Sequence, residues 1–240
     1  GPLNLATEPF DAQICSATRG RCIPQPGTSV QVETLADRLM FRLAYRNFGD
    51  YETLVVNHSV KAGDSAGVRW YELRKSGGDW AIHQQDTYAP DGHYRWMGSV
   101  AMDGEGNIGI GYSVSSDSLY PSIRYSGHKA GDPLNATPYR ERSIVEGTDS
   151  HTNDNRWGDY SAMGVDPVDD CTFWYTNEHY PTTVITPNQS YNWQMSIGAF
   201  KFPDCDPLPA VGWITGTFYN SVTSGLIGNA PLAGLNGPMT

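Results

Sequence analysis

The chain has 240 residues, and its 26 acidic and 16 basic side chains give a formal net charge of −10. An acidic surface repels phosphate backbones, so the composition argues against nucleic-acid binding. No apolar run is long enough to cross a bilayer, so we expect no membrane insertion. Aromatic residues make up 12% of the chain, beside 26 Gly and 16 Pro. This mixture favours short strands joined by tight turns, and we expect very little helix.

Residues 1–33 are expected to form an irregular arm, because they carry several prolines and no clear period. The arm contains two of the four cysteines, Cys15 and Cys22, and the others are Cys171 and Cys205. No C-x-x-C spacing is present, so two disulfides are favoured over a metal site. Because disulfides persist in oxidising compartments, we expect a secreted, extracellular chain.

Three matched units follow the arm, and each opens on an arginine. Arg38, Arg95 and Arg156 recur at intervals of about sixty residues, a period typical of repeat architectures. In each unit a short apolar stretch, a turn rich in Gly, Asn and Asp, and a second stretch come next. The first stretches are 41–45, 100–102 and 162–165, the turns are 47–50, 103–107 and 166–170, and the second stretches are 53–56, 108–112 and 172–176.

Each unit also contains a third strand, and two units contain a fourth. The third strands are predicted at 67–73, 121–125 and 193–200, and the fourth at 80–84 and 142–145. Four antiparallel strands at a constant period are typical of propeller blades. The predicted fold is therefore all-β and β-propeller-like, with repeats at 34–93, 94–154 and 155–204. An irregular β-sandwich with chance internal similarity is the alternative.

The order of strands in the third unit predicts the disulfide pairing. Cys171 opens the second strand of that unit, and Cys205 follows its third strand. Antiparallel strands folded about the polar stretch near Asn188 bring these two cysteines side by side. Cys15 then pairs with Cys22 across a short loop.

Residues 205–240 are expected to be a linker and tail. Within them, 213–220 is similar to the first strand of a small β-sandwich module. Three blades are too few for a closed ring, which has four to eight. We therefore expect one of three arrangements: capping by the arm and tail, self-association, or further blades on a larger parent polypeptide.

Two stretches carry a resemblance to a known group of proteins. Residues 103–113 (DGEGNIGIGYS) look like the hairpin of sialidase-like propeller repeats, and 156–161 (RWGDYS) with 173–180 (FWYTNEHY) resemble uncharacterised secreted bacterial proteins of that kind. The resemblance covers roughly residues 35–204 and implies a propeller architecture. The Asp-box of true sialidases is absent, so the resemblance implies the architecture more than the activity.

The matched arginines are the first candidate site. Arg38, Arg95 and Arg156 stand where the first strand of each unit begins, and first strands line the channel of a propeller. Three guanidinium groups at one mouth would bind an anion, and sialidases hold a substrate carboxylate with an arginine triad. The alternative is that each arginine ties its own unit to a neighbouring carboxylate.

Glu178 and Asp159 are the second candidate site. Glu178 lies among aromatic residues, which can raise the pKa of a carboxyl and make it a general acid. Asp159 would supply the second carboxylate that glycoside hydrolysis needs. Tyr160 and Tyr175 are the aromatic ligand-binding candidates. The alternative is a solvated glutamate beside packed rings.

Acidic residues in two of the turns suggest calcium, although either loop alone offers too few oxygens and a plain turn is the simpler interpretation. The residues concerned are Asp103, Asp166, Asp169 and Asp170. No other cofactor or metal is expected. The leading functional hypothesis is a non-catalytic extracellular module that binds glycan or protein. A sialidase-like glycosidase is the alternative, and a structural segment for assembly is a third.

Overall fold

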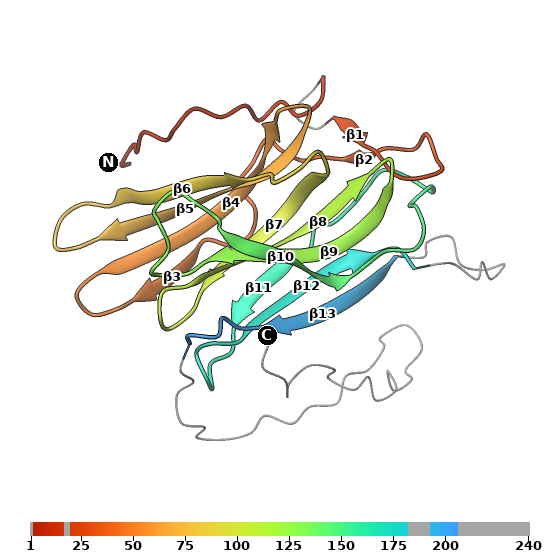
Figure 1. The fold of residues 1–240 in the computed structure, drawn as a ribbon. Helices are drawn as coiled ribbons and strands as arrows, with labels where there is room; N and C mark the ends of the chain where they lie inside the picture. Colours follow the sequence, from red (N-terminus) through yellow and green to blue (C-terminus); the bar gives the residue numbers. More distant parts are fainter. Residues whose placement is uncertain (1, 17–19, 182–192, 206–240) are drawn as a thin grey trace.

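The computed structural model describes residues 2–16, 20–181 and 193–205. These residues form thirteen strands and no helix, so the all-β prediction is confirmed for this part of the chain. No segment within it is a helix that could span a membrane. Three antiparallel sheets lie one on another, with the N-terminal arm along the first and across their ends (Figure 1).

Each sheet follows the order of the chain, so neighbouring strands are joined as hairpins. The first sheet contains β3 (Ala44–Asn47), β4 (Glu52–Ala62), β5 (Ser65–Lys75) and β6 (Ala81–Tyr88). The second contains β7 (Tyr94–Met102), β8 (Ile108–Ser116), β9 (Leu119–His128) and β10 (Tyr139–Val145). The third contains β11 (Ala162–Val165), β12 (Phe173–His179) and β13 (Gln194–Phe200).

The predicted strands match these elements closely, with one correction. The first apolar stretch was placed at 41–45, but β3 begins at Ala44, where its regular pairing with β4 starts. Leu39, Phe41 and Leu43 lie before or at its start with exposed side chains. Among the described residues the third sheet has three strands, and the chain after residue 205 lies outside the described part.

The first and second sheets pack through a core of large apolar side chains. Strand β7 contacts β3, β4 and β5 on this side and β11 on the other, so it lies near the middle of the stack. The Trp70 indole is fully buried and donates its Nε1–H to Thr137 Oγ1 at 2.9 Å. The remaining core members share complete or nearly complete burial: Val55, Val68, Val100, Ile108, Ile110 and Tyr112.

The second and third sheets approach closely because β8 carries glycines where β12 carries rings. A Cβ atom on Gly109 would come within 2.7 Å of the Phe173 ring, and one on Gly111 within 2.5 Å of the Tyr175 ring. The alternating pattern in 108–112 therefore has a physical reason: its isoleucines face the first sheet and its glycines receive the aromatic rings of the third.

The arm is more regular than the sequence predicts. Strands β1 (Arg21–Ile23) and β2 (Val32–Glu33) pair in a two-stranded antiparallel sheet, and the predicted disulfide ties Cys22 of β1 to Cys15. Ile23 and Val32 are fully buried in a cluster with Trp96 and Trp157. This burial explains the order of the arm, since the arm covers apolar surface that the three sheets leave open.

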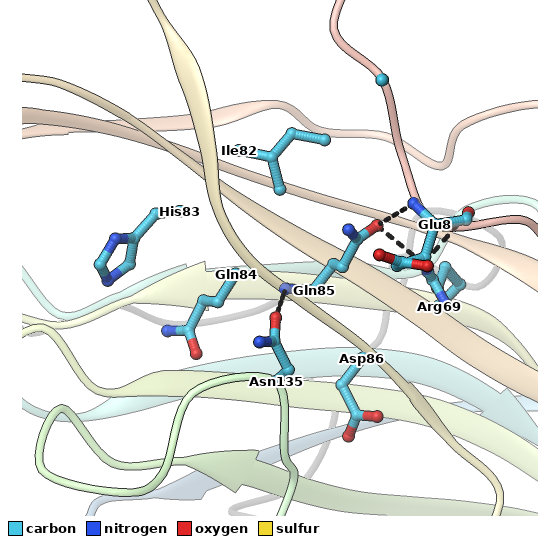
Figure 2. Close-up of a pocket in the computed structure, with 9 residues that line it drawn as sticks. Glu8, Arg69, Ile82, His83, Gln84, Gln85, Asp86 and Asn135 are labelled. Atoms are coloured by element: carbon cyan, nitrogen blue, oxygen red, sulfur yellow. Dashed lines mark hydrogen bonds between the residues drawn. The ribbon is translucent and has the colours of Figure 1, made fainter.

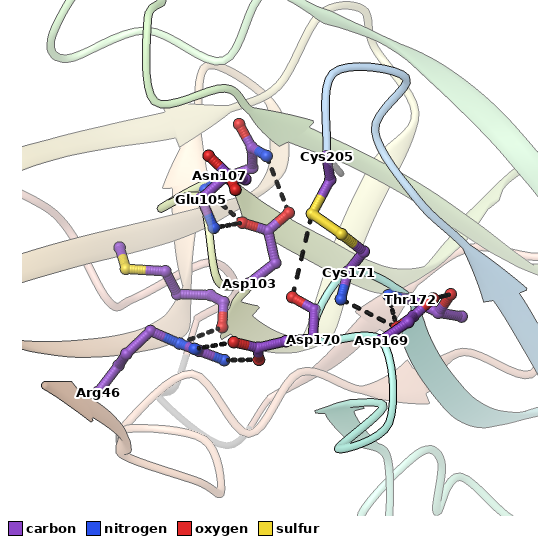
Figure 3. The surroundings of a disulfide bond; sticks show 10 residues. Arg46, Asp103, Glu105, Asn107, Asp169, Asp170, Cys171, Thr172 and Cys205 are labelled. Carbon is purple, nitrogen blue, oxygen red and sulfur yellow. Dashed lines mark hydrogen bonds and ion pairs between the residues drawn. A yellow bond between two sulfur atoms is a disulfide. The ribbon is translucent and has the colours of Figure 1, made fainter. Parts of the chain in front are cut away.

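One junction joins the three sheets near the second disulfide (Figure 3). The predicted Cys171–Cys205 bond is present, with its Cα atoms 5.7 Å apart. Beside it, Arg46 of β3 binds both carboxylate oxygens of Asp170 at 2.7 and 2.6 Å. Arg46 Nε also donates to the carbonyl oxygen of Met102, at the end of β7. A single guanidinium therefore ties together parts of all three sheets.

Candidate functional site

The three matched arginines do not converge on one point, and each is already paired with a carboxylate. Arg38 donates to both oxygens of Asp37, its chain neighbour, at 2.8 and 2.9 Å on the surface. The negative charge of Glu33 also acts on Arg38, and Glu33 forms an ion pair with Arg156. Arg95 binds different carboxylates from those that Arg38 and Arg156 bind.

Arg95 is fully buried, and its five N–H groups are all used. They bind Asp91, Glu141 and the carbonyl oxygen of His93 at 2.7 to 3.2 Å. The hydrogen bonds from Arg95 lower the pKa of Asp91 to about 2. Glu141 also accepts bonds from Tyr112 and Arg124. Arg95 therefore serves as a bridge between Asp91 and Glu141, and a ligand would have to displace these carboxylates to reach the buried guanidinium.

Arg156 is the one matched arginine that lies with the predicted acidic pair. Its guanidinium forms a close ion pair with Asp159 and lies 3.5 Å from Glu33 Oε2. Half of the Arg156 side chain is exposed, whereas Asp159 and Glu33 are mostly covered. We call Glu33, Asp154, Arg156, Asp159 and Glu178 the Arg156 corner.

Glu178 has the electrostatics that the sequence suggests. Burial raises its pKa from 4.5 to about 7, and the charge of Asp154 adds to this. The backbone N–H of Gly158 and the charge of Arg156 act in the opposite direction without cancelling it. Near neutral pH this carboxyl is therefore able to donate as well as accept a proton.

The local sequence 156–161 explains how Arg156 and Tyr160 reach the surface. Trp157 is buried between them and donates its indole N–H to Ser113 Oγ on β8 at 3.0 Å. Gly158 has φ +65°, a left-handed conformation that suits glycine and turns the chain. Tyr160 is 87% exposed, the largest value among the exposed hydrophobic residues of the described chain.

His151 and Asp154 belong to this region but were missed by the sequence reasoning. His151 Nε2 lies 2.7 Å from Asp154 Oδ1, and its buried ring contacts the edges of Trp157 and Tyr180. Its Nδ1 is buried without a hydrogen-bond partner among the described residues, as is Asp159 Oδ1. The polar run at 150–155, between two predicted strands, was the signal that could have identified them.

Two strained backbone positions lie beside the same corner. Leu35 and Met97 have φ of 43° and 50°, uncommon for residues other than glycine. Both are buried in the cluster that contains Trp157. Strained residues of this kind collect at binding and catalytic sites, where the surrounding structure holds them in place.

Tyr175 does not belong to this surface. Its side chain is fully buried between the second and third sheets, and its hydroxyl accepts a 2.7 Å hydrogen bond from Asn177 Nδ2. Burial raises its pKa well above the ordinary value. The structure therefore places Tyr175 in the core, and Tyr160 is the exposed member of the predicted aromatic pair.

The carboxylates suggested for calcium are all engaged by donors of the protein. Asp103 accepts bonds from the backbone of Glu105 and Asn107, and Asp170 pairs with Arg46 (Figure 3). Asp169 caps the turn at 171–172, and Asp166 accepts bonds from Val168 N and the Trp174 indole. Among the residues placed by the structure, no cluster of three or more potential metal ligands is found.

A separate hollow of about 530 Å³ lies between the arm and β6 (Figure 2). Gln85 connects its two sides: its Oε1 accepts from Glu8 N and Arg69 Nη2, and its backbone N–H donates to Asn135 Oδ1. A second hollow of about 440 Å³ continues along β6. Both hollows are open and polar, and no residue of the Arg156 corner lines either one.

Comparison with known proteins adds no further constraint. No protein-family model matches the sequence, and no curated protein matches it.

Proposed function

We propose that the protein is an extracellular, propeller-like recognition module that binds a neutral glycan at the Arg156 corner. The observation that carries this proposal is the 87% exposed Tyr160 beside the Arg156–Asp159 ion pair. An exposed tyrosine flanked by carboxylates and a guanidinium is a suitable platform for a sugar ring, because the aromatic face stacks on C–H groups and the charged groups bind hydroxyls.

The propeller-like part of the proposal is supported by the way the sheets stack. The more extensive contacts between different sheets involve β3, β4, β5, β7, β8, β9, β11 and β12, and none of them involves the fourth strands β6 and β10. Contacts that centre on the first strand β7 are what neighbouring blades would make, and the last strands β10 and β13 also meet, at Ile144 and Gly198. The units at 34–93, 94–154 and 155–204 each contribute one such sheet.

The extracellular part rests on the two disulfides. Cys15–Cys22 and Cys171–Cys205 use every cysteine of the chain, and such bonds persist in oxidising compartments. The acidic composition, with a net charge of −10, suits a soluble surface.

The charge of the corner favours a neutral ligand over an anion. Four carboxyl groups surround one guanidinium, which Asp159 and Glu33 already neutralise. An anionic glycan would have to break the Arg156–Asp159 pair, whereas sugar hydroxyls can donate to carboxylates and accept from Arg156 without displacing either.

A glycan array covering neutral and sialylated or sulfated oligosaccharides tests this proposal. We expect binding to neutral members and its loss in the Tyr160→Ala variant. Binding confined to acidic members would contradict the assignment of a neutral ligand. No binding at all would contradict the glycan function.

A sialidase-like glycosidase is the second candidate, and the pKa of Glu178 favours it. A carboxyl with a pKa of about 7 can act as a general acid, and Asp159, which pairs with Arg156, would supply the second carboxylate. A panel of chromogenic glycosides distinguishes the two functions. Turnover that disappears in Glu178→Gln while folding is retained would establish the enzyme, and no turnover across the panel leaves the binding module.

A further inference from the structure

The third sheet has one buried side and one exposed side. Across β12 and β13, the register pairs Trp174 with Ala199, Thr176 with Ile197 and Glu178 with Met195, so these six side chains share one side. The opposite side carries Phe173 and Tyr175, which pack on the second sheet. We call the side that carries Ile197 the outer face.

Apolar side chains on the outer face remain exposed in the described structure. Met195 and Ile197 are 45% and 62% exposed, and Trp193, just before β13, is 48% exposed. Side chains of this size clustered on one sheet face are typical of an interaction surface.

The corresponding faces of the two preceding sheets are buried by the next sheet. On β4, Val55 and Asn57 are fully buried against the second sheet, and the Asn57 amide lies against Gly98 of β7. On β8, Gly111 receives the Tyr175 ring of the third sheet. The outer face continues this series, and a further β-sheet face is therefore the surface that fits it.

The other end of the stack is already covered by the chain's own arm. Phe10 lies edge-on to the His58 ring with centroids 4.7 Å apart, and the carbonyl oxygen of Asp11 accepts a hydrogen bond from Lys61 N at 2.7 Å. If copies stacked head to tail, the outer face of one copy would have to displace the arm from the first sheet of the next. Two outer faces can pack together without displacing the arm.

The charge of the outer face also permits two copies to meet. Although the chain carries a net charge of −10, Glu178 is the only ionisable side chain among the six paired residues of the outer face, because His179 and Tyr175 lie on the opposite side of β12. Repulsion between acidic surfaces is therefore weak where apolar area would be buried.

We propose that the outer face of β11–β13 is a self-association surface, on which the same face of a second copy packs about a two-fold axis. Such an interface forms a closed dimer, because each copy buries the same face and neither copy has a second outer face with which to bind another copy. Its core is formed by Met195 and Ile197 from both copies, with the β13 strands near the axis. This inference does not depend on the glycan proposal.

Sedimentation of the full chain from about 1 to about 100 μM tests the proposal. We expect a dimer for the wild type and a folded monomer for Ile197→Lys, because a buried, unpaired ammonium is not tolerated at the centre of the interface. Leu134→Lys is the matched control: Leu134 is 53% exposed in the loop between β9 and β10, and we expect its variant to remain dimeric.

Two results would overturn the proposal. The first is a wild type that stays monomeric at the highest concentration. The second is a dimer that survives Ile197→Lys but dissociates in Phe41→Lys, which would assign association to the exposed strip before β3. If the Ile197 variant does not fold, Met195→Glu on the same face replaces it with the same expected outcome.

Discussion

The ring of Tyr175 on β12 lies so close to the backbone of Gly111 on β8 that a Cβ atom at residue 111 would be 2.5 Å from Tyr175 Cδ1. Tyr175 is fully buried, so its ring cannot swing away into solvent. The contact fixes the spacing of the second and third sheets and requires glycine at position 111.

We expect Gly111→Ala to lower the free energy of unfolding by about 1–3 kcal/mol, because the added methyl overpacks the core between the sheets. Urea unfolding measures the change. Gly164→Ala is the matched control, since Gly164 is also in a strand of this region and has no atom within 4 Å of an added Cβ. Equal stability of the two variants would show that the sheets are not packed as closely as described.

The Arg46–Asp170 pair should contribute to stability well beyond an ordinary surface ion pair. The ion pair is bidentate and both side chains are partly buried. Arg46 also donates a hydrogen bond to the Met102 carbonyl oxygen. We expect Arg46→Ala to cost about 1–3 kcal/mol and Arg46→Lys to recover only part of it, because an ammonium cannot make the paired contact.

Arg38→Ala is the comparison for that experiment. Arg38 pairs with its neighbour Asp37 on the surface, so its removal should leave the midpoint of urea unfolding unchanged. If Arg46→Ala is as stable as Arg38→Ala, the junction of the three sheets does not depend on the guanidinium.

Glu178 should make stability fall as pH rises. In the unfolded chain this carboxyl has a pKa near 4.5, and in the folded chain it has a pKa of about 7. Between those values the folded state keeps a proton that the unfolded state has lost, so stability is highest below the window and has lost this contribution above it. The total change is at most about 3 kcal/mol, reduced by partial exposure of the side chain.

The comparison of wild type with Glu178→Gln isolates this contribution. We expect the free energy of unfolding of the wild type, minus that of the variant, to decrease between about pH 4.5 and about pH 7 and to be flat above. Groups such as His58, whose pKa burial lowers to about 4, cancel in the difference. A difference independent of pH would mean that Glu178 is solvated and titrates normally.

Most of the strand order was predictable from the sequence because the repeat has a clear physical basis. Alternation and turn residues located the three hairpin units, and the antiparallel order gave the Cys171–Cys205 pairing that the structure confirms. The start of β3 was wrong because 39–43 is largely apolar but joins β4 only through the Met40 N–H and the Asn57 carbonyl oxygen, and composition alone does not distinguish a strand from such a stretch.

The candidate site was harder to predict, because it depends on which side chains meet across the fold. Matched positions suggested that Arg95 and Arg156 act together, yet Arg95 points into the second sheet, where Glu141 and Asp91 neutralise it. The partners of a charged side chain come from strands distant in sequence, as Glu33 and Arg156 do. His151 and Asp154 gave no periodic signal, and Asp154, which His151 binds, comes near Glu178 only when β12 is in place.

The glycan proposal is tested most directly by calorimetric titration of a neutral oligosaccharide selected on the array. We expect Tyr160→Ala to weaken its affinity at least about tenfold, because the stacking platform is lost. Tyr45→Ala, which removes an exposed tyrosine of the first sheet, should bind as the wild type does. Equal affinity of the wild type and Tyr160→Ala would contradict recognition at the Arg156 corner.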